Sequence, residues 1–161
     1  MSQVDAKSIF TDPVHFLAFG FGSGLAPKAP GTFGTLAAIP CYYFLHFLSV
    51  SNYLLVLLAT TLLGIYLCGE SAKRLKAHDH PGIVWDEFVG FFITMTAIPF
   101  TLVNLVIGFC LFRLFDILKP WPIKWIDNKV SGGFGIMLDD IIAGVFAWIG
   151  LYGINYLWLA A

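Results

Sequence analysis

The sequence predicts an all-α, polytopic membrane helical bundle of about five hydrophobic helices with a glycine-rich N-terminal loop. Hydrophobic residues make up 58% of the 161 residues and charged residues 12%, whereas a soluble domain averages about 45–50% apolar and about 25% charged residues. The mean hydropathy is +0.82, and the apolar residues gather in five runs. A chain of this length fits one domain, so we expect residues 1–161 to form a single membrane-embedded unit.

The expected elements follow from these runs. Residues 1–32 are expected to form a cytoplasmic leader and the glycine-rich loop. The membrane helices are expected at residues 34–48, 53–69, 88–98, 102–118 and 136–159. A spanning helix needs about 20 residues, so the second, fourth and fifth runs are long enough to cross the membrane. The first is short, and the third is too short to cross alone. A short helix is tolerated where its polar end lies in a cavity lined by protein.

The basic residues predict an orientation. Lysines and arginines lie before the first run, after the second, and from the end of the fourth onward. The links at residues 49–52 and 99–101 and the tail after Tyr156 contain none. If all five runs cross the membrane, every basic residue lies on the same side of it. The positive-inside rule makes this the cytoplasmic side. We therefore expect the charged residues at the cytoplasmic face.

The link at residues 99–101 is so short that the third and fourth runs are expected to form a tight hairpin. Counting from Phe100, Glu87 lies thirteen residues back and Arg113 thirteen forward, so both are expected about 20 Å below the turn. Asp86 and Asp116 fall close to the same level. Charged groups at that depth cost free energy unless they are paired, hydrated or bound to metal.

The first of three polar segments is the glycine-rich stretch at residues 20–32. Its glycines allow successive backbone N–H groups to form an anion-binding nest, and its lysine adds charge. The spacing is not that of a Walker P-loop, so nucleotide binding is not expected. A flexible loop without a ligand is an equally good interpretation. The residues expected to contact a phosphate here are Gly22, Ser23, Gly24, Lys28 and Thr32.

The second polar segment runs from residue 78 to residue 87. Asp86 and Glu87 open the third helix, where acids often only complement the helix dipole. His78 and His80 are candidates for proton transfer because histidine titrates near neutral pH. Loop histidines beside lipid headgroups are, however, more common than catalytic ones.

The third polar segment begins at Arg113 and ends at Asp140. Arg113 and Asp116 stand three residues apart and share a helix face, so a buried ion pair without function is the simpler interpretation. Asp139 and Asp140 are neighbours, about 100° apart on a helix. We expect only one of the two to face a site unless the helix start is unwound.

Together, five carboxylates and an arginine converge at one depth in a chain with ten acids. Oxygen ligands suit Mg²⁺, which usually takes one or two carboxylates together with water and substrate phosphate. Arg113 and Lys119 are the cationic groups that a phosphate needs. The residues therefore predict a divalent-metal site for a phosphorylated lipid at the headgroup level. The candidate metal ligands are Asp86, Glu87, Asp139 and Asp140.

Three stretches closely resemble the bacterial phosphatidylglycerophosphatase A family. They are residues 20–40 (GFGSGLAPKAPGTFGTLAAIP), 78–90 (HDHPGIVWDEFVG) and 112–144 (FRLFDILKPWPIKWIDNKVSGGFGIMLDDIIAG). The resemblance implies a Mg²⁺-dependent hydrolase of the bacterial cytoplasmic (inner) membrane. Such an enzyme removes the terminal phosphate of phosphatidylglycerophosphate to give phosphatidylglycerol. The headgroup and the direction of reaction come from the resemblance alone.

Roles for the individual residues follow as hypotheses. Lys28, Arg113 and Lys119 are expected to hold nonbridging phosphate oxygens. Asp116 is expected to act as a base toward water or to orient Arg113, and His78 or His80 to protonate the departing alkoxide. Direct attack by water is favoured over an aspartyl-phosphate intermediate.

Other functions compete with this one. A small ion or metabolite transporter would carry its binding groups near the bilayer midplane, whereas here they lie toward one end. A phosphatase of another phospholipid monophosphate and a purely structural subunit are the remaining alternatives. The net charge of −1 favours no nucleic-acid partner. The expected partners are the phospholipid substrate and the membrane, with no obligate protein partner.

Overall fold

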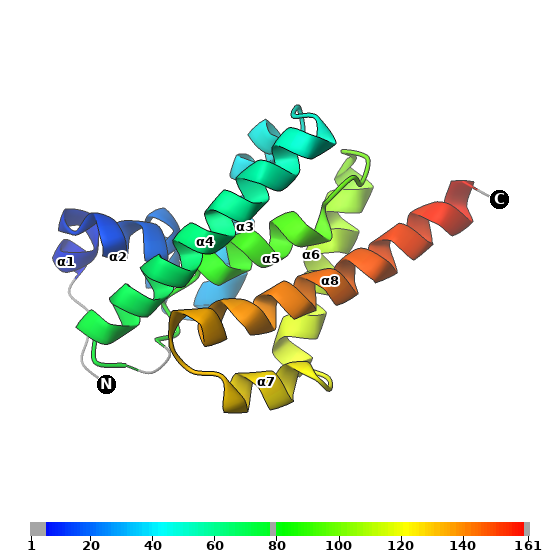
Figure 1. Ribbon diagram of the computed structural model, residues 1–161. Helices are drawn as coiled ribbons and strands as arrows, with labels where there is room; N and C mark the ends of the chain where they lie inside the picture. Colours follow the sequence, from blue (N-terminus) through cyan, green and yellow to red (C-terminus); the bar gives the residue numbers. More distant parts are fainter. Residues whose placement is uncertain (1–5, 78–79, 160–161) are drawn as a thin grey trace.

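The computed structural model describes residues 6–77 and 80–159, and these ranges contain helices and no strand (Figure 1). The predicted all-α class is therefore confirmed. The elements are α1 (Ala6–Thr11), α2 (Pro13–Ala18), the 3₁₀ helix η1 (Gly20–Leu25), α3 (Pro30–Leu45), α4 (Val50–Arg74), α5 (Trp85–Thr94), α6 (Leu102–Leu118), α7 (Ile123–Lys129) and α8 (Gly132–Leu159).

Several helices extend beyond the predicted apolar runs. The fourth run coincides with α6, but α3 begins at Pro30, where the fixed φ of proline suits the first helical position. Helix α4 continues to Arg74, and α8 already begins at Gly132. Backbone hydrogen bonding does not depend on side-chain polarity, so a helix does not end where its apolar run ends. The part of the predicted leader from Ala6 onward is largely helical rather than a plain loop.

Helix α5 is short because protein encloses it. Figure 1 shows α5 between α4 and α8, and it also packs against α3 and α6. Eight of its ten residues are buried, so α5 does not need the length of a helix that faces lipid. It ends at Thr94 and not at the predicted residue 98, because the chain turns there and Ala97 adopts a left-handed conformation with φ 56°.

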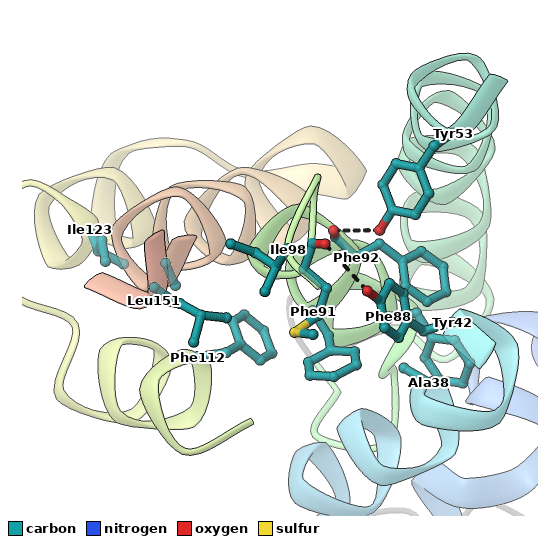
Figure 2. Close-up of a cluster of buried hydrophobic side chains, with 13 residues drawn as sticks. Ala38, Tyr42, Tyr53, Phe88, Phe91, Phe92, Ile98, Phe112, Ile123 and Leu151 are labelled. Carbon is teal, nitrogen blue, oxygen red and sulfur yellow. Dashed lines mark hydrogen bonds between the residues drawn. The ribbon is translucent and has the colours of Figure 1, made fainter. Parts of the chain in front are cut away.

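Side chains from neighbouring helices satisfy the carbonyl groups at the end of α5. The Tyr53 hydroxyl donates a hydrogen bond to the Phe92 carbonyl at 2.6 Å, and Trp148 Nε1 donates to the Thr96 carbonyl at 2.9 Å. Figure 2 shows the Tyr53 bond beside the aromatic rings of Tyr42, Phe91 and Phe92 in the main core. A helix end in an apolar interior is stable only with such partners.

Glycines let α8 approach its neighbours closely. A Cβ atom on Gly144 would lie 2.5 Å from the Gly90 carbonyl oxygen of α5, and one on Gly133 would lie 1.9 Å from the Ile65 carbonyl oxygen of α4. Small residues at such crossings allow backbones to pack in contact, as they do in membrane bundles. These approaches hold α8 against both α4 and α5.

The exterior is that of a membrane protein. Helix α4 carries exposed large apolar side chains along its length, including Leu55, Leu58 and Leu62, and contiguous apolar surface of this kind marks a lipid or protein contact. Within the described ranges, two helical segments are long and apolar enough to cross a membrane, Val50–Arg74 and Gly132–Trp158. The remaining hydrophobic helices are shorter: α3 has 16 residues, α5 has 10 and α6 has 17. The structure thus supports two of the five expected spans by length.

Candidate active site

Four helix ends meet around one polar cavity of about 240 Å³. The starts of α3 and α5, the end of α6 and the early part of α8 supply its walls, together with the loop before α5. The residues lining this carboxylate cavity are Ala29, Pro30, Gly31, Pro81, Ile83, Asp86, Glu87, Arg113, Asp116, Lys119, Asp139 and Asp140. All four predicted metal ligands line this cavity, as do Arg113, Asp116 and Lys119.

The carboxylates form two overlapping groups. Oxygen atoms of Asp86, Glu87 and Asp140 lie within 4.8 Å of one another, and so do oxygen atoms of Asp116, Asp139 and Asp140. Like charges at this distance repel one another unless cations lie between them. Glu87, Asp139 and Asp140 are buried, so water screens this repulsion poorly.

Asp139 and Asp140 both reach the same group, contrary to the expectation that adjacent residues on a helix point apart. The helix is not unwound, since α8 is already helical from Gly132. One oxygen of each carboxylate nevertheless lies within 4.8 Å of the other and of an Asp116 oxygen. The bond from Cβ to the carboxyl group gives each side chain enough reach to offset the 100° step.

Arg113 lies beside Glu87, at the common level predicted by counting along the hairpin. Its guanidinium lies 2.7 Å from an Asp116 oxygen and 3.7 Å from a Glu87 oxygen. The connection between α5 and α6 is longer than predicted, because α5 ends at Thr94. The levels nevertheless match, so Arg113 supplies positive charge to both carboxylate groups.

Lys119 supplies the second positive charge from the residue that ends α6. Its ammonium group donates hydrogen bonds to Asp139 at 2.6 Å and to Asp127 at 2.9 Å. Burial lowers the pKa of Lys119, but these bonds and charges outweigh burial and raise the pKa above its usual range. Lys119 therefore carries its charge throughout the physiological pH range.

Asp127 is a site residue that the sequence did not reveal. It lies on α7 and reaches Lys119 across the turn that follows α6. An acid eight residues after a lysine has no helical or strand spacing that predicts contact. Only the reversal of the chain between α6 and α7 brings the two together.

The backbone at the start of α3 closes one side of the carboxylate cavity. A Cβ atom on Gly31 would lie 2.1 Å from Glu87 Oε1 and 3.0 Å from a guanidinium nitrogen of Arg113. A residue with a side chain at this position would displace that carboxylate. The glycine-rich segment thus contributes to the site through Gly31, which was not among the predicted contacts.

The other predicted residues of the glycine-rich segment lie elsewhere. Gly24 is packed against the backbone of Gly82, and Lys28 is exposed. None of the five lines the carboxylate cavity, and their contact with phosphate stays a prediction. The five residues are Gly22, Ser23, Gly24, Lys28 and Thr32.

His80 lines a neighbouring cavity of about 460 Å³, which shares Pro30 and Pro81 with the carboxylate cavity. The backbone N–H of Gly82 donates to His80 Nδ1 at 3.1 Å, so a neutral ring carries its proton on Nε2. The other predicted histidine, His78, lies outside the described residues.

The donor set of the carboxylate cavity fits a divalent cation. Oxygen atoms Glu87 Oε2 and Asp139 Oδ1 are buried without a hydrogen-bond partner. Buried polar atoms are nearly always paired, and an exception requires an explanation such as a bound ion. Carboxylate oxygens are the ligands that Mg²⁺ prefers.

Comparison with known proteins identifies the family. A family model described as phosphatidylglycerophosphatase A matches residues 16–155. The chain belongs to the phosphatidylglycerophosphatase A family. The matched range includes every described residue of the carboxylate cavity.

Curated relatives agree with this family membership. A phosphatidylglycerophosphatase A of Escherichia coli (strain K12) is 50% identical over 149 residues, covering 92% of this chain and 87% of the relative. One of Haemophilus influenzae is 47% identical over 152 residues, covering 93% of each chain. A Bacteroides thetaiotaomicron protein with the provisional name phosphatidylinositol-3-phosphatase is 37% identical over 137 residues, covering 81% of this chain and 86% of that protein. No solved structure matches this chain.

Crowding of the carboxylates predicts that removing one charge stabilises the protein when metal is absent. With chelator at pH 8, Asp140→Asn is expected to raise the unfolding temperature, because pairwise repulsion of about 1–3 kcal/mol is relieved. Thermal unfolding of the detergent-purified variants measures this. Asp12→Asn is the matched control, because it removes a charge paired with Arg74 while an asparagine still caps α2. An Asp140→Asn protein less stable than the wild type in chelator would contradict this account of the cluster.

Proposed function

We propose that this chain is a Mg²⁺-dependent lipid phosphatase that hydrolyses the terminal phosphate monoester of phosphatidylglycerophosphate to phosphatidylglycerol and phosphate. The observation that carries the proposal is the carboxylate cavity, where five acids and two cationic side chains meet at the polar end of an apolar helical assembly. Family membership and the names of the relatives supply the substrate.

The cationic side chains are suited to hold the phosphate. Arg113 presents a planar guanidinium that binds phosphate oxygens in pairs, and Asp116 holds that guanidinium at 2.7 Å. Lys119 points into the same cavity through its bond to Asp139. A phosphate bound between Arg113 and Lys119 would replace some of their present contacts with carboxylates. Such a site favours a doubly charged phosphate over a neutral ligand.

The carboxylates would hold the cation. Asp86, Glu87, Asp139 and Asp140 are the proposed ligands, and the bound ion would neutralise phosphate charge and lower the pKa of a coordinated water. Asp116 keeps Arg113 in position and lies in one group with Asp139 and Asp140, so it is the proposed base toward a water held there. His80, with its proton on Nε2 in the adjoining cavity, is the proposed donor to the departing alkoxide.

We also propose that the carboxylate cavity faces the cytoplasm of the bacterial inner membrane. The basic residues of the described chain lie in α1, before α3, at the ends of α4 and α6, and in α7. In this arrangement α3, α4, α6 and α8 contact lipid, while α5 is the fifth, enclosed helix of the bundle. A cavity at the polar end suits a headgroup that remains at the membrane surface, and it differs from the midplane site of a transporter.

The direct experiment measures phosphate release from phosphatidylglycerophosphate in detergent micelles. We expect turnover with Mg²⁺, loss of at least about 90% of it with chelator, and recovery when Mg²⁺ is restored. Phosphatidate and phosphatidylinositol 3-phosphate serve as competing substrates, since one relative bears the latter specificity in its name. Phosphate release that is unchanged by chelator would exclude a requirement for metal. Equal turnover of all three lipids would exclude the proposed specificity for phosphatidylglycerophosphate.

A pair of substitutions tests which cations bind phosphate. Arg113→Lys is expected to lower kcat/KM by at least about 100-fold, because a lysine loses the paired geometry of the guanidinium. Lys28→Ala is expected to change kcat/KM less than about twofold, since Lys28 is exposed and does not line the carboxylate cavity. Initial rates across a range of lipid concentrations give both values. Similar losses in the two variants would contradict the assignment and would restore Lys28 to the phosphate site.

A further inference from the structure

Asp140 is common to both carboxylate groups. One group joins it to Asp86 and Glu87 from α5, and the other joins it to Asp116 from α6 and Asp139 from α8. Asp140 is 3% exposed, so its carboxylate is almost completely enclosed while it lines the cavity. A carboxylate between two sets of acids has the position of a bridging ligand.

Each group holds a buried oxygen that lacks a hydrogen-bond partner. In the first group this atom is Glu87 Oε2, and in the second it is Asp139 Oδ1. Glu87 is 8% exposed and Asp139 is 7% exposed. An unpartnered buried carboxylate oxygen costs free energy, and two such atoms in separate groups are better explained by two cation positions than by one.

The charge balance favours two divalent ions over one. With all five carboxylates ionised, Arg113 and Lys119 leave three negative charges among the side chains lining the described cavity, and Asp127, which also pairs with Lys119, adds a fourth. One divalent ion would leave the cavity still negative before substrate arrives. A phosphate monoester adds between one and two further negative charges. Two divalent ions offset these four charges, so the site no longer repels the phosphate.

Ligand number leads to the same conclusion. Mg²⁺ binds at about 2.0–2.1 Å in an octahedron, usually through one or two carboxylates with water completing the shell. Five carboxylates exceed what one such ion takes. Three oxygens within 4.8 Å are spaced to surround one ion after a small inward movement, and there are two such sets.

We propose that the carboxylate cavity binds two divalent cations bridged by Asp140. One ion lies with Asp86 and Glu87, and the other lies with Asp116 and Asp139. The inference rests on the proposed function and deepens it, because paired ions about 3.5–4 Å apart stabilise both the attacking and the leaving oxygen in phosphoryl transfer. It also makes Asp116 a ligand of the second ion in addition to its contact with Arg113.

The test counts bound ions without any substrate, with Mn²⁺ as the probe. Equilibrium dialysis of detergent-purified protein, with bound metal measured by mass spectrometry, is expected to give two Mn²⁺ per chain. Electron paramagnetic resonance is expected to show the exchange coupling of a bridged pair. Glu87→Gln and Asp139→Asn are each expected to retain one uncoupled ion, and Asp140→Asn to lose the coupling. Asp12→Asn, whose carboxylate pairs with Arg74, is the charge-matched control and is expected to keep two coupled ions.

The outcomes separate this inference from the proposed function. One ion per wild-type chain, together with Mg²⁺-dependent phosphate release, would overturn the pair and leave the proposed function standing. No bound ion at any millimolar concentration would overturn both. Two ions in Glu87→Gln and in Asp139→Asn would overturn the assignment of ligands. The wild-type count stands on its own even if a variant does not fold.

Discussion

The mutual repulsion of five carboxylates around one small cavity is the interaction on which the rest of the structure depends. Arg113 and Lys119 offset part of this charge, through contacts of 2.7 Å to Asp116 and 2.6 Å to Asp139. The remaining charge is buried, and burial without a partner is unfavourable for any carboxylate. A protein retains such an arrangement when a cation or a reaction requires it, since the same positions filled by neutral residues would be more stable.

The surrounding fold keeps these groups in place. Helix α5 is enclosed on several sides and its carbonyl end is satisfied by Tyr53 and Trp148, so its first turn is fixed in position. That turn carries Asp86 and Glu87, where the positive end of the helix dipole offsets some of the repulsion. The close crossing of Gly90 and Gly144 then sets the distance at which α8 presents Asp140. The aromatic packing at the carboxyl-terminal end of α5 thus helps to hold the acids of its first turn in place.

Much of this could be predicted from the sequence, for physical reasons that apply to particular residues. The period of helices and the short link after α5 were enough to place Glu87 beside Arg113, because depth in a helical assembly follows from counting residues. The acids and the arginine stood out because charged residues are few in so apolar a chain. Asp127 could not be found, since its contact with Lys119 depends on the turn between α6 and α7. The contribution of Gly31 was also missed, because a close approach of backbone to a carboxylate leaves no pattern in the neighbouring residues. The glycine-rich segment was expected to contact phosphate through Gly22, Ser23, Gly24, Lys28 and Thr32, whereas the described cavity meets this segment at Ala29, Pro30 and Gly31.

The one measurement that tests the central claim most directly is anomalous X-ray scattering from crystals of the protein grown with Mn²⁺. We expect anomalous density inside the carboxylate cavity, on both sides of Asp140, with the oxygens of Glu87 and Asp139 turned toward it. Density at an exposed acid elsewhere, with the carboxylate cavity filled by water or closed by protons shared between its acids, would contradict it.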